Sequence, residues 1–168
     1  MTSNNKGGSV VELIVVVAII GGSLAAILGL VALSLVSSGI ARQTQEAVFL
    51  AQEAMEALRN YRDGVPWDQD DPLNQYDGFE YVNFALNPFH LEKSTDSPPQ
   101  WKLVSGAETV GIFTREIIME FAHRDANDDI VPSGTQDPDT LAILVRVSWQ
   151  ERGRTHTVEI ASYLTNWK

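Results

Sequence analysis

A long apolar segment near the N-terminus constrains most strongly what this chain can fold into. The segment runs from Val10 to Val36 and carries a single charged residue, Glu12. At about 1.5 Å per residue, a helix of this length reaches about 40 Å, enough to cross a bilayer with some tilt. A carboxylate within a membrane span costs about 2.5–3.5 kcal/mol on insertion scales, so Glu12 needs a partner. We therefore predict a membrane-entering helix in which Glu12 is a functional residue.

The residues before the apolar segment suggest where that partner comes from. Met1 to Gly7 form a short polar leader with one cation, Lys6, and Gly8 follows. A secretory signal peptide is cleaved after its apolar region, whereas this small-residue pair lies before it. Cleavage after Gly7 would leave the apolar helix on the mature chain. It would also create an α-amino group on Gly8, about one helical turn from Glu12.

This N-terminal stretch resembles the signature of type IV pilins and of the pseudopilins of type II secretion. The resemblance rests on Lys6-Gly7, Gly8 as the first mature residue, Glu12 as the fifth, and the aliphatic run from Leu13 to Gly21. It implies cleavage after Gly7 by a prepilin peptidase, N-methylation of Gly8, and assembly into a filament through the N-terminal helix. In such filaments the fifth-residue glutamate neutralises the amine of an adjacent subunit. By this resemblance, Glu12 would pair with Gly8 of a neighbouring copy.

Two positions depart from the usual family pattern. The family generally has Phe where this chain has Gly8, and many members have Pro where it has Gly29. Gly21, Gly22 and Gly29 each weaken a helix interior by about 1 kcal/mol relative to Ala. Two interpretations follow: the helix unwinds locally in a filament, or the glycines allow close packing of helices in lipid.

Composition restricts the remaining function classes. The chain has 168 residues, and the part that follows the leader and the apolar helix is long enough for one soluble domain. Its net charge of −10 disfavours a surface that binds nucleic acid. The lack of cysteine excludes thiol catalysis, zinc sites built on cysteine and disulfides. No nucleophile elbow, phosphate loop, dinucleotide fingerprint or zinc-protease helix occurs, so we expect a structural protein and not an enzyme.

The helix is predicted to continue past the apolar segment to the sequence Asp63-Gly64-Val65-Pro66, where Gly and Pro end it. Its second half is amphipathic, with an apolar stripe at helical spacing. The stripe comprises Ile40, Ala47, Ala51, Ala54, Met55, Leu58 and Tyr61. The predicted organisation is a leader (1–7), a transmembrane or filament-core half of the helix (8–36), an amphipathic half (37–63) and a soluble β domain (64–168).

The soluble domain is predicted to form an antiparallel sheet packed on the amphipathic half of the helix, a pilin-like α+β fold. An acidic connection from Trp67 to Gly78, ordered against the surface, comes first. The expected strands are Phe79 to Leu86, Phe89 to Glu92, Trp101 to Val104, Ile112 to His123, Leu141 to Trp149 and Thr155 to Leu164. The last two strands form a hairpin that turns through Gln150 to Arg154.

Parts of the domain also resemble minor pilins of the pilus-modification group and the I- and J-type minor pseudopilins. These parts are Leu50 to Asp63, Val147 to Trp149, and the last strand with the segment up to Trp167. The implied partners are other pilin or pseudopilin subunits, the prepilin peptidase and methyltransferase, and an inner-membrane assembly platform. The implied location is the cytoplasmic membrane with the C-terminal domain outside, and then a periplasmic or surface filament.

A cofactor is not expected, although one segment leaves a calcium site open. Asp125, Asn127 and Asp129, with Asp137 or Asp139, could form a calcium loop, and some related pseudopilins carry calcium. An EF-hand is excluded because Ile130 replaces its glycine and Gln136 its bidentate glutamate. The alternative is a solvated strand connection. The acidic segment from Trp67 to Gly78 is dense in carboxylates but lacks a fixed ligand spacing.

Other side chains with chemical potential have structural explanations. His90, His123 and His156 lie singly on predicted strands without a second ligand at metal spacing. Trp67, Trp101 and Trp167 could stack on sugars or a partner, but burial in the sheet domain is favoured.

Two alternatives to a filament subunit remain. A single-pass, membrane-anchored extracytoplasmic binding domain would account for everything except Gly7, Gly8 and Glu12. An anchored hydrolase would need Glu116 and Glu120 as paired carboxylates in a cleft, whereas both fall on one side of one predicted strand.

Overall fold

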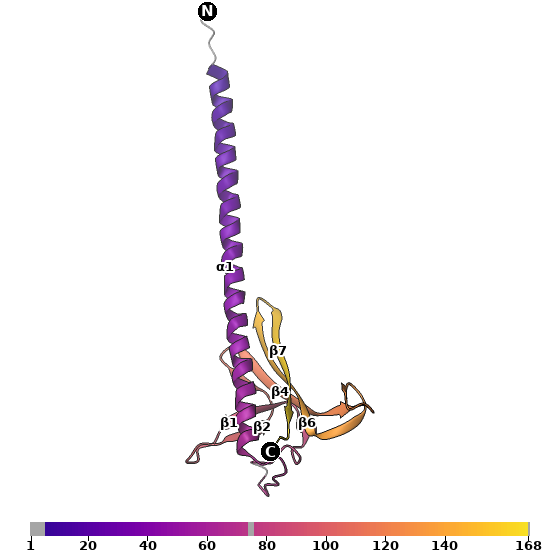
Figure 1. Ribbon diagram of the computed structural model, residues 1–168. Coiled ribbons are helices and arrows are strands. Elements are labelled where there is room, and N and C mark those ends of the chain that lie inside the picture. The colour runs from indigo at the N-terminus through magenta and orange to yellow at the C-terminus, as the bar shows by residue number, and fades with distance from the viewer. Residues whose placement is uncertain (1–5, 74–75, 168) are drawn as a thin grey trace, which may run out of the picture. The chain divides into compact units, whose positions relative to one another are not determined.

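The computed structural model describes residues 6–73 and 76–167 (Figure 1). Helix α1 (Lys6–Gly64) begins the described chain, and the 3₁₀ helix η1 (Phe84–Leu86) follows. The strands are β1 (Phe89–Lys93), β2 (Trp101–Ser105), β3 (Glu108–Val110), β4 (Phe113–Arg124), β5 (Ile130–Val131), β6 (Thr135–Glu151) and β7 (Arg154–Thr165). One long N-terminal helix and an antiparallel sheet make this an α+β protein, as predicted.

The chain forms two compact units, Met1–Gln43 and Thr44–Lys168. In its described part, the first unit is the apolar portion of α1. The second contains the remainder of α1 and all seven strands. The predicted helix end is confirmed: α1 ends at Gly64, the Val65 N–H donates to the Tyr61 carbonyl at 2.9 Å, and Pro66 follows.

Within the second unit, α1 packs on the sheet through the predicted stripe from Ala47 to Tyr61, and the strands lie alongside this part of the helix (Figure 1). Ile40, the first residue of that prediction, is half-exposed and belongs to the first unit. The buried side chains of α1 are Ala47, Ala51, Ala54, Met55, Ala57, Leu58 and Tyr61. Four of these seven are alanine, so the helix axis can approach the sheet closely. Gln52, Glu53 and Glu56 occupy the exposed side.

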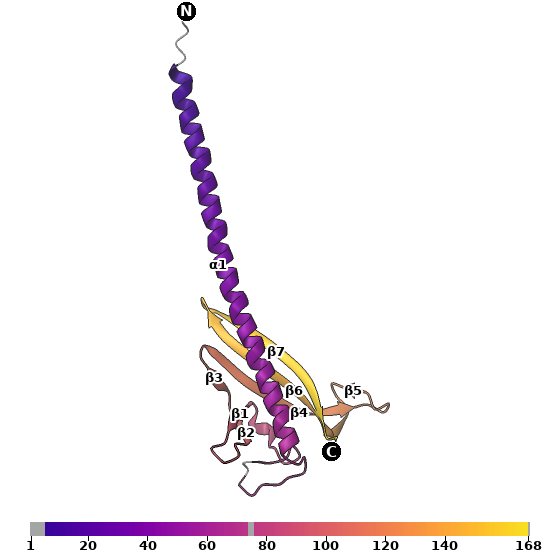
Figure 2. The same cartoon turned by 60° about the vertical axis from the view of Figure 1, so that its left-hand side comes forward.

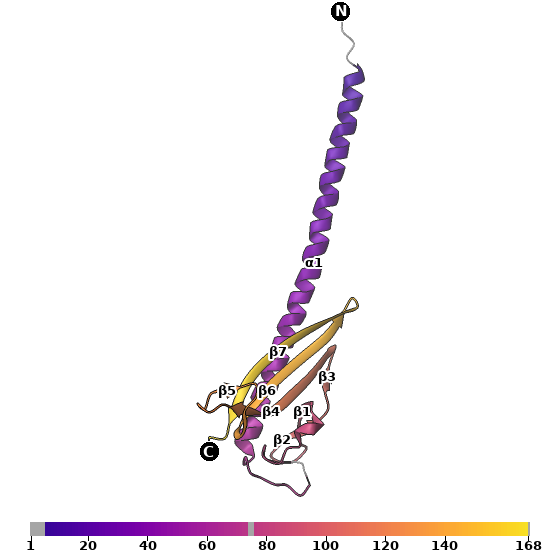
Figure 3. The same ribbon diagram turned by 90° about the vertical axis from the view of Figure 1, so that its right-hand side faces the viewer.

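The strand order is β2-β1-β4-β6-β7, with β3 and β5 also paired to β4 (Figure 3). All pairings are antiparallel. The interior strand β6, which lies between β4 and β7, alternates regularly between buried and half-exposed residues from Leu141 to Trp149. That alternation directs one face to α1 and the other outward.

Strands β6 and β7 form the predicted hairpin, but its turn is tighter than expected. Glu151 pairs with Arg154, leaving only Arg152 and Gly153 between the strands. Both have positive φ, 50° and 76°, as a type I′ turn requires. Glycine at position 153 meets this requirement without strain.

The predicted strand from Phe79 to Leu86 is wrong. This segment forms turns and then η1, where the Asn83 side chain accepts a hydrogen bond from the Ala85 N–H at 3.1 Å. Phe79 is buried because its ring contacts Tyr61 and Trp67, with centroids 5.6 and 5.2 Å away. The Phe79 side chain therefore packs against the C-terminal end of α1, and the backbone of this segment does not pair with the sheet.

The sheet also contains strands that periodicity did not predict. Strands β3 and β5 are short additions along β4, and β6 begins at Thr135, six residues before its predicted start at Leu141 (Figure 2). The β4–β6 register shifts between Phe121 and Ala122. Polar residues before Leu141 therefore continue the ladder past an irregularity, where the pattern of apolar residues has stopped.

Candidate functional site

Gly7, Gly8 and Glu12 all lie in the first turns of α1. Glu12 is exposed, and so are the side chains around it, with Val11 62% and Leu13 64% accessible. Glu12 therefore lies on an exposed apolar surface in the part of the helix whose side chains are described, from residue 10 onward. Most of the proposed leader, residues 1–5, lies outside the described residues, so the structure does not test its removal.

The apolar part of α1 is long and apolar enough to cross a membrane. Its most hydrophobic window has a mean hydropathy of 2.8, and none of it is buried within the protein. The Ser23 hydroxyl donates to the Ile19 carbonyl at 2.7 Å, so this polar group is satisfied within the helix. The helix is continuous through Gly21, Gly22 and Gly29, and a Cβ at each would meet no other side chain within 4 Å. These glycines expose backbone to which another helix could pack closely.

A buried arginine joins α1 to the sheet. Arg115 on β4 faces the helix, and its side chain is only 10% accessible. Its guanidinium donates to the Leu50 carbonyl at 3.1 Å, to Glu53 at 3.3 Å and to Glu108 on β3 at 3.0 Å. One cation therefore ties the helix, β3 and β4 together. The sequence places Arg115 within the predicted strand Ile112 to His123 but gives no sign of this role, because the helix residues that it contacts lie far away in the sequence.

The end of α1 is held by the acidic connection, whose residues 67–73 and 76–78 are ordered beside it, while positions 74 and 75 of this predicted segment lie outside the described residues. Tyr61 donates its hydroxyl to the Asp77 carbonyl at 2.6 Å, and burial, with Asp77 and Asp71 nearby, raises the pKa of Tyr61. The Asp71 carboxylate accepts from the Tyr76 N–H at 3.1 Å, and the Asp77 carboxylate accepts from the Asp71 N–H at 2.9 Å. These two carboxylates therefore organise the loop backbone.

Gly78 completes this connection by a close backbone approach. A Cβ at this position would lie 2.2 Å from the carbonyl oxygens of Pro66 and Trp67. Any larger residue would separate the loop from the end of the helix.

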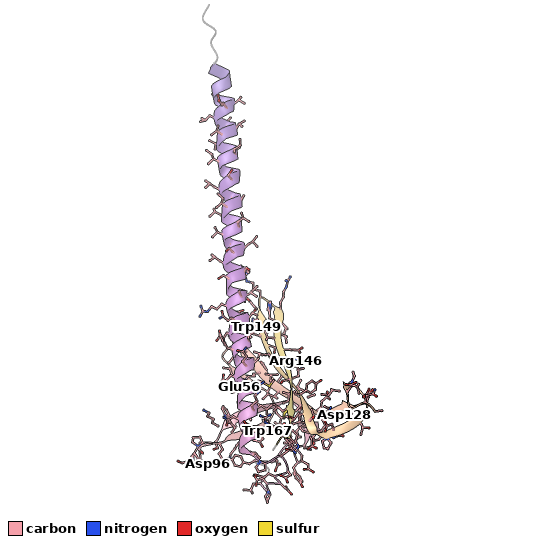
Figure 4. The ribbon with its side chains drawn as sticks, viewed as in Figure 1. Glu56, Asp96, Asp128, Arg146, Trp149 and Trp167 are labelled. Carbon is pink, nitrogen blue, oxygen red and sulfur yellow. The ribbon has the colours of Figure 1, made fainter. Side chains whose placement is uncertain are left out.

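The proposed calcium segment forms a turn closed by its own backbone. The Asp125 carboxylate accepts from the N–H groups of Asn127 and Asp129 at 2.8 and 3.1 Å, and these bonds lower the pKa of Asp125. Asp128, at φ 70°, lies in the loop well away from α1 (Figure 4). The geometry is that of an Asx turn.

Asp137 and Asp139 do not join Asp125 around a common point. Asp137 accepts from Arg124 at 2.7 Å, which lowers the pKa of Asp137, and Asp139 accepts from the Asn166 amide at 2.9 Å. Within residues 6–73 and 76–167, no three His, Cys, Asp or Glu side chains are positioned to hold a metal ion.

The remaining chemical candidates occupy separate places. His90 contacts the Gly106 carbonyl and Glu92, while the His156 ring stacks on Trp149 at 5.3 Å. For the three tryptophans predicted to be buried, the prediction is confirmed for Trp67, Trp101 is half-buried, and the prediction is wrong for Trp167, which is 64% accessible.

Trp167 lies near the C-terminal end of α1 (Figure 4). It borders a cavity of about 480 Å³ that Arg62 and Gly64 also line. The Arg62 guanidinium lies 5.7 Å from the centre of the Trp167 ring, so a cation of the chain itself already approaches this aromatic surface.

The outer face of the sheet carries two features that sequence analysis missed. Arg146 on β6 bonds to Glu116 on β4 at 2.9 Å and to Glu159 on β7 at 2.6 Å, which gives Glu116 a structural role (Figure 4). The next row, Ile118, Leu144 and Ala161, is apolar, and a cavity of about 340 Å³ lies beside it. Only the register between strands reveals these rows.

Comparisons with protein-family models, with curated proteins and with solved structures found no match to this chain.

Proposed function

We propose that this chain is a structural subunit, a minor pilin or pseudopilin, of a type IV pilus or type II secretion filament. The observation that carries the proposal is that one lone carboxylate, Glu12, lies on an otherwise uncharged apolar helix segment that is not buried within the protein. The same helix continues into a segment whose apolar stripe is covered by an antiparallel sheet. An exposed apolar surface of this length needs lipid or other helices around it.

In this proposal, prepilin peptidase cleaves after Gly7 and Gly8 becomes the N-terminus. The Gly8 amine of one subunit then lies beside the Glu12 carboxylate of the next. Each charge alone is costly in an apolar medium, and pairing removes most of that cost. The pair therefore favours assembled subunits over the single helix in lipid, which gives the filament both its driving force and its axial register.

Before assembly, the subunit is anchored in the cytoplasmic membrane by the apolar part of α1, with the sheet domain outside. Its partners are other pilin or pseudopilin subunits, the processing enzyme and the inner-membrane assembly platform. The role is structural and not enzymatic.

Glu12→Ala tests the pairing directly. We expect membrane insertion to be unchanged or improved, because a residue costing about 2.5–3.5 kcal/mol in the span is removed. Filament incorporation should fall by about tenfold or more, since about 1.4 kcal/mol of lost pairing already has that effect. The measurement compares subunit in sheared filaments with subunit in membranes.

Glu46→Ala is the matched control, because Glu46 is an exposed carboxylate of the same helix outside the apolar segment. It should leave both fractions unchanged. Equal incorporation of Glu12→Ala and the original chain would contradict the pairing and favour a simple membrane-anchored binding domain.

A further inference from the structure

The outer edge of β7 is a long strand edge available for pairing. β7 is last in the strand order, and among the described strands it pairs only with β6. It is 12 residues long, about twice the usual strand length. Exposed strand edges of this length are templates for another chain.

The hairpin geometry identifies which backbone groups face away from β6. The two-residue turn makes Glu151 and Arg154 the closing pair, which exchanges both ladder hydrogen bonds. Even-numbered residues then bond to β6, in agreement with the Asn166 N–H donating to the Asp139 carbonyl at 2.8 Å just beyond the strand. The odd-numbered residues direct their N–H and C=O groups to the free edge. They are Thr155, Thr157, Glu159, Ala161, Tyr163 and Thr165.

The usual features that prevent edge pairing are missing from β7. The strand contains neither Pro nor Lys, and its register with β6 is regular from Thr140 to Glu151. After Arg154 at the turn, its helix-facing residues carry no carboxylate, Lys or Arg; they are His156, Val158, Ile160, Ser162 and Leu164. Glu159, on the outer face, is held by Arg146.

Two rows on the outer face reach this edge. Ile118, Leu144 and Ala161 form an apolar row that ends at β7. The neighbouring row begins with the carboxylate of Glu120 on β4, continues through Ala142 and ends at Tyr163, which is 52% accessible. The cavity of about 340 Å³ lies between these rows. A strand added beside β7 would extend both rows and place its own side chains next to Ala161 and Tyr163.

We propose that the free edge of β7 binds an extended segment of a different polypeptide by strand addition. Backbone hydrogen bonds to the odd-numbered residues supply affinity, and alternate side chains supply specificity. Facing Ala161 and Tyr163, the bound segment carries uncharged apolar or β-branched residues. This inference goes beyond the proposed filament role and concerns a separate surface of the sheet domain.

A second copy of the chain is a poorer occupant. Two β7 edges related by a two-fold axis would pair antiparallel, so the α1 segments packed on the two sheets would also run antiparallel. Each chain also carries a net charge of −10, which opposes self-association.

The test uses the full chain in detergent micelles and a short capped peptide of alternating valine and threonine with a lysine at each end. A twin peptide has every valine and threonine amide N-methylated, so these amides cannot donate hydrogen bonds. We expect the first peptide to bind and to slow amide hydrogen exchange within Arg154–Thr165. The twin should bind roughly tenfold or more weakly, because the edge hydrogen bonds are lost.

Two substitutions locate the binding to the edge. Ala161→Pro removes an N–H that faces away from β6, and Ala161→Lys places a charge beside the arriving strand. Both should weaken binding of the unmethylated peptide roughly tenfold. Ser148→Lys is the control because Ser148 lies on the same outer face, on the interior strand β6.

Equal binding of the two peptides would overturn the proposal even if the Ala161 variants failed to fold. So would failure of the unmethylated peptide to bind, or protection confined to another strand. A reversible dimer of the original chain that Ala161→Lys abolishes would assign the edge to a second copy instead, which also contradicts the proposal.

Discussion

At the scale of single residues, Arg115 and Glu12 place a charge in an apolar environment with opposite outcomes. Arg115 finds its partners within the chain, at Glu53, Glu108 and the Leu50 carbonyl. Glu12 lies on an exposed apolar helix, where the proposed partner belongs to another subunit. The first residue therefore stabilises the fold, whereas the second is proposed to stabilise the assembly.

Arg115→Met tests the structural half of this contrast. The variant keeps most of the buried side-chain volume but removes the hydrogen bonds that Arg115 donates to Glu53, Glu108 and the Leu50 carbonyl. We expect the free energy of unfolding to fall by about 1–3 kcal/mol, at the lower end of buried charge effects because both carboxylates are partly exposed. Chemical denaturation in detergent provides the measurement.

Arg146→Met is the matched control. Arg146 also bonds to two carboxylates, but its side chain is 37% accessible on the outer face. Exposed ion pairs contribute only about 0–1 kcal/mol, so this variant should be nearly as stable as the original chain. If both variants lost the same stability, burial of Arg115 would not be the cause of its effect.

At the scale of elements, the alanine-rich side of α1 sets how closely the helix packs on the sheet. Ala51 is fully buried at this contact, while the adjacent Gln52 is exposed. We expect Ala51→Leu to lower the free energy of unfolding by about 1–3 kcal/mol, because the added atoms force the helix away from the sheet. Gln52→Leu makes a similar side chain at an exposed position and should change stability by less than about 0.5 kcal/mol. Thermal melts of both variants measure these changes in stability. An equal loss of stability in the two variants would show that the packing of α1 on the sheet is loose.

The elements also show how far sequence reasoning reaches. The end of α1, its buried stripe, the β6–β7 hairpin and most strands follow from periodicity and from Gly and Pro signals, which are local. The aromatic residues of Phe79–Leu86 suit a sheet, which is why the sequence predicts a strand there. In the structure, Phe79 is instead buried against Tyr61 and Trp67. Local pattern could not distinguish those two ways of burying the same side chain.

The candidate functional residues also fall into two groups, those that local sequence can predict and those that depend on contacts between distant segments. Gly7, Gly8 and Glu12 are predicted from their order in the N-terminal segment and from the resemblance of that segment to the prepilin signature, both of which are local features of the sequence. The partners of Arg115 and the apolar row ending at Ala161 depend on strand register, which joins residues far apart in the chain. Register follows from the assembled sheet, so neither feature was accessible from the sequence.

At the scale of the whole molecule, polarity is distributed very unequally along the chain. The apolar part of α1 has a mean hydropathy of 2.8 in its most hydrophobic window, whereas the chain as a whole has a net charge of −10. A chain with this distribution is suited to hold its N-terminal helix in lipid or among other helices, with the acidic sheet domain in water. The proposed filament meets both requirements, since helices gather in its interior and sheet domains cover its surface.

The central claim is that processing at Gly7 creates the amine with which Glu12 pairs, and the N-terminus of the native chain tests it most directly. Intact mass and N-terminal peptide analysis should be made on protein isolated from its native host. We expect a mature chain that begins at Gly8, with the mass of one added methyl group where the amine is methylated. A chain that begins at Met1, or at any residue beyond Val36, would contradict the account.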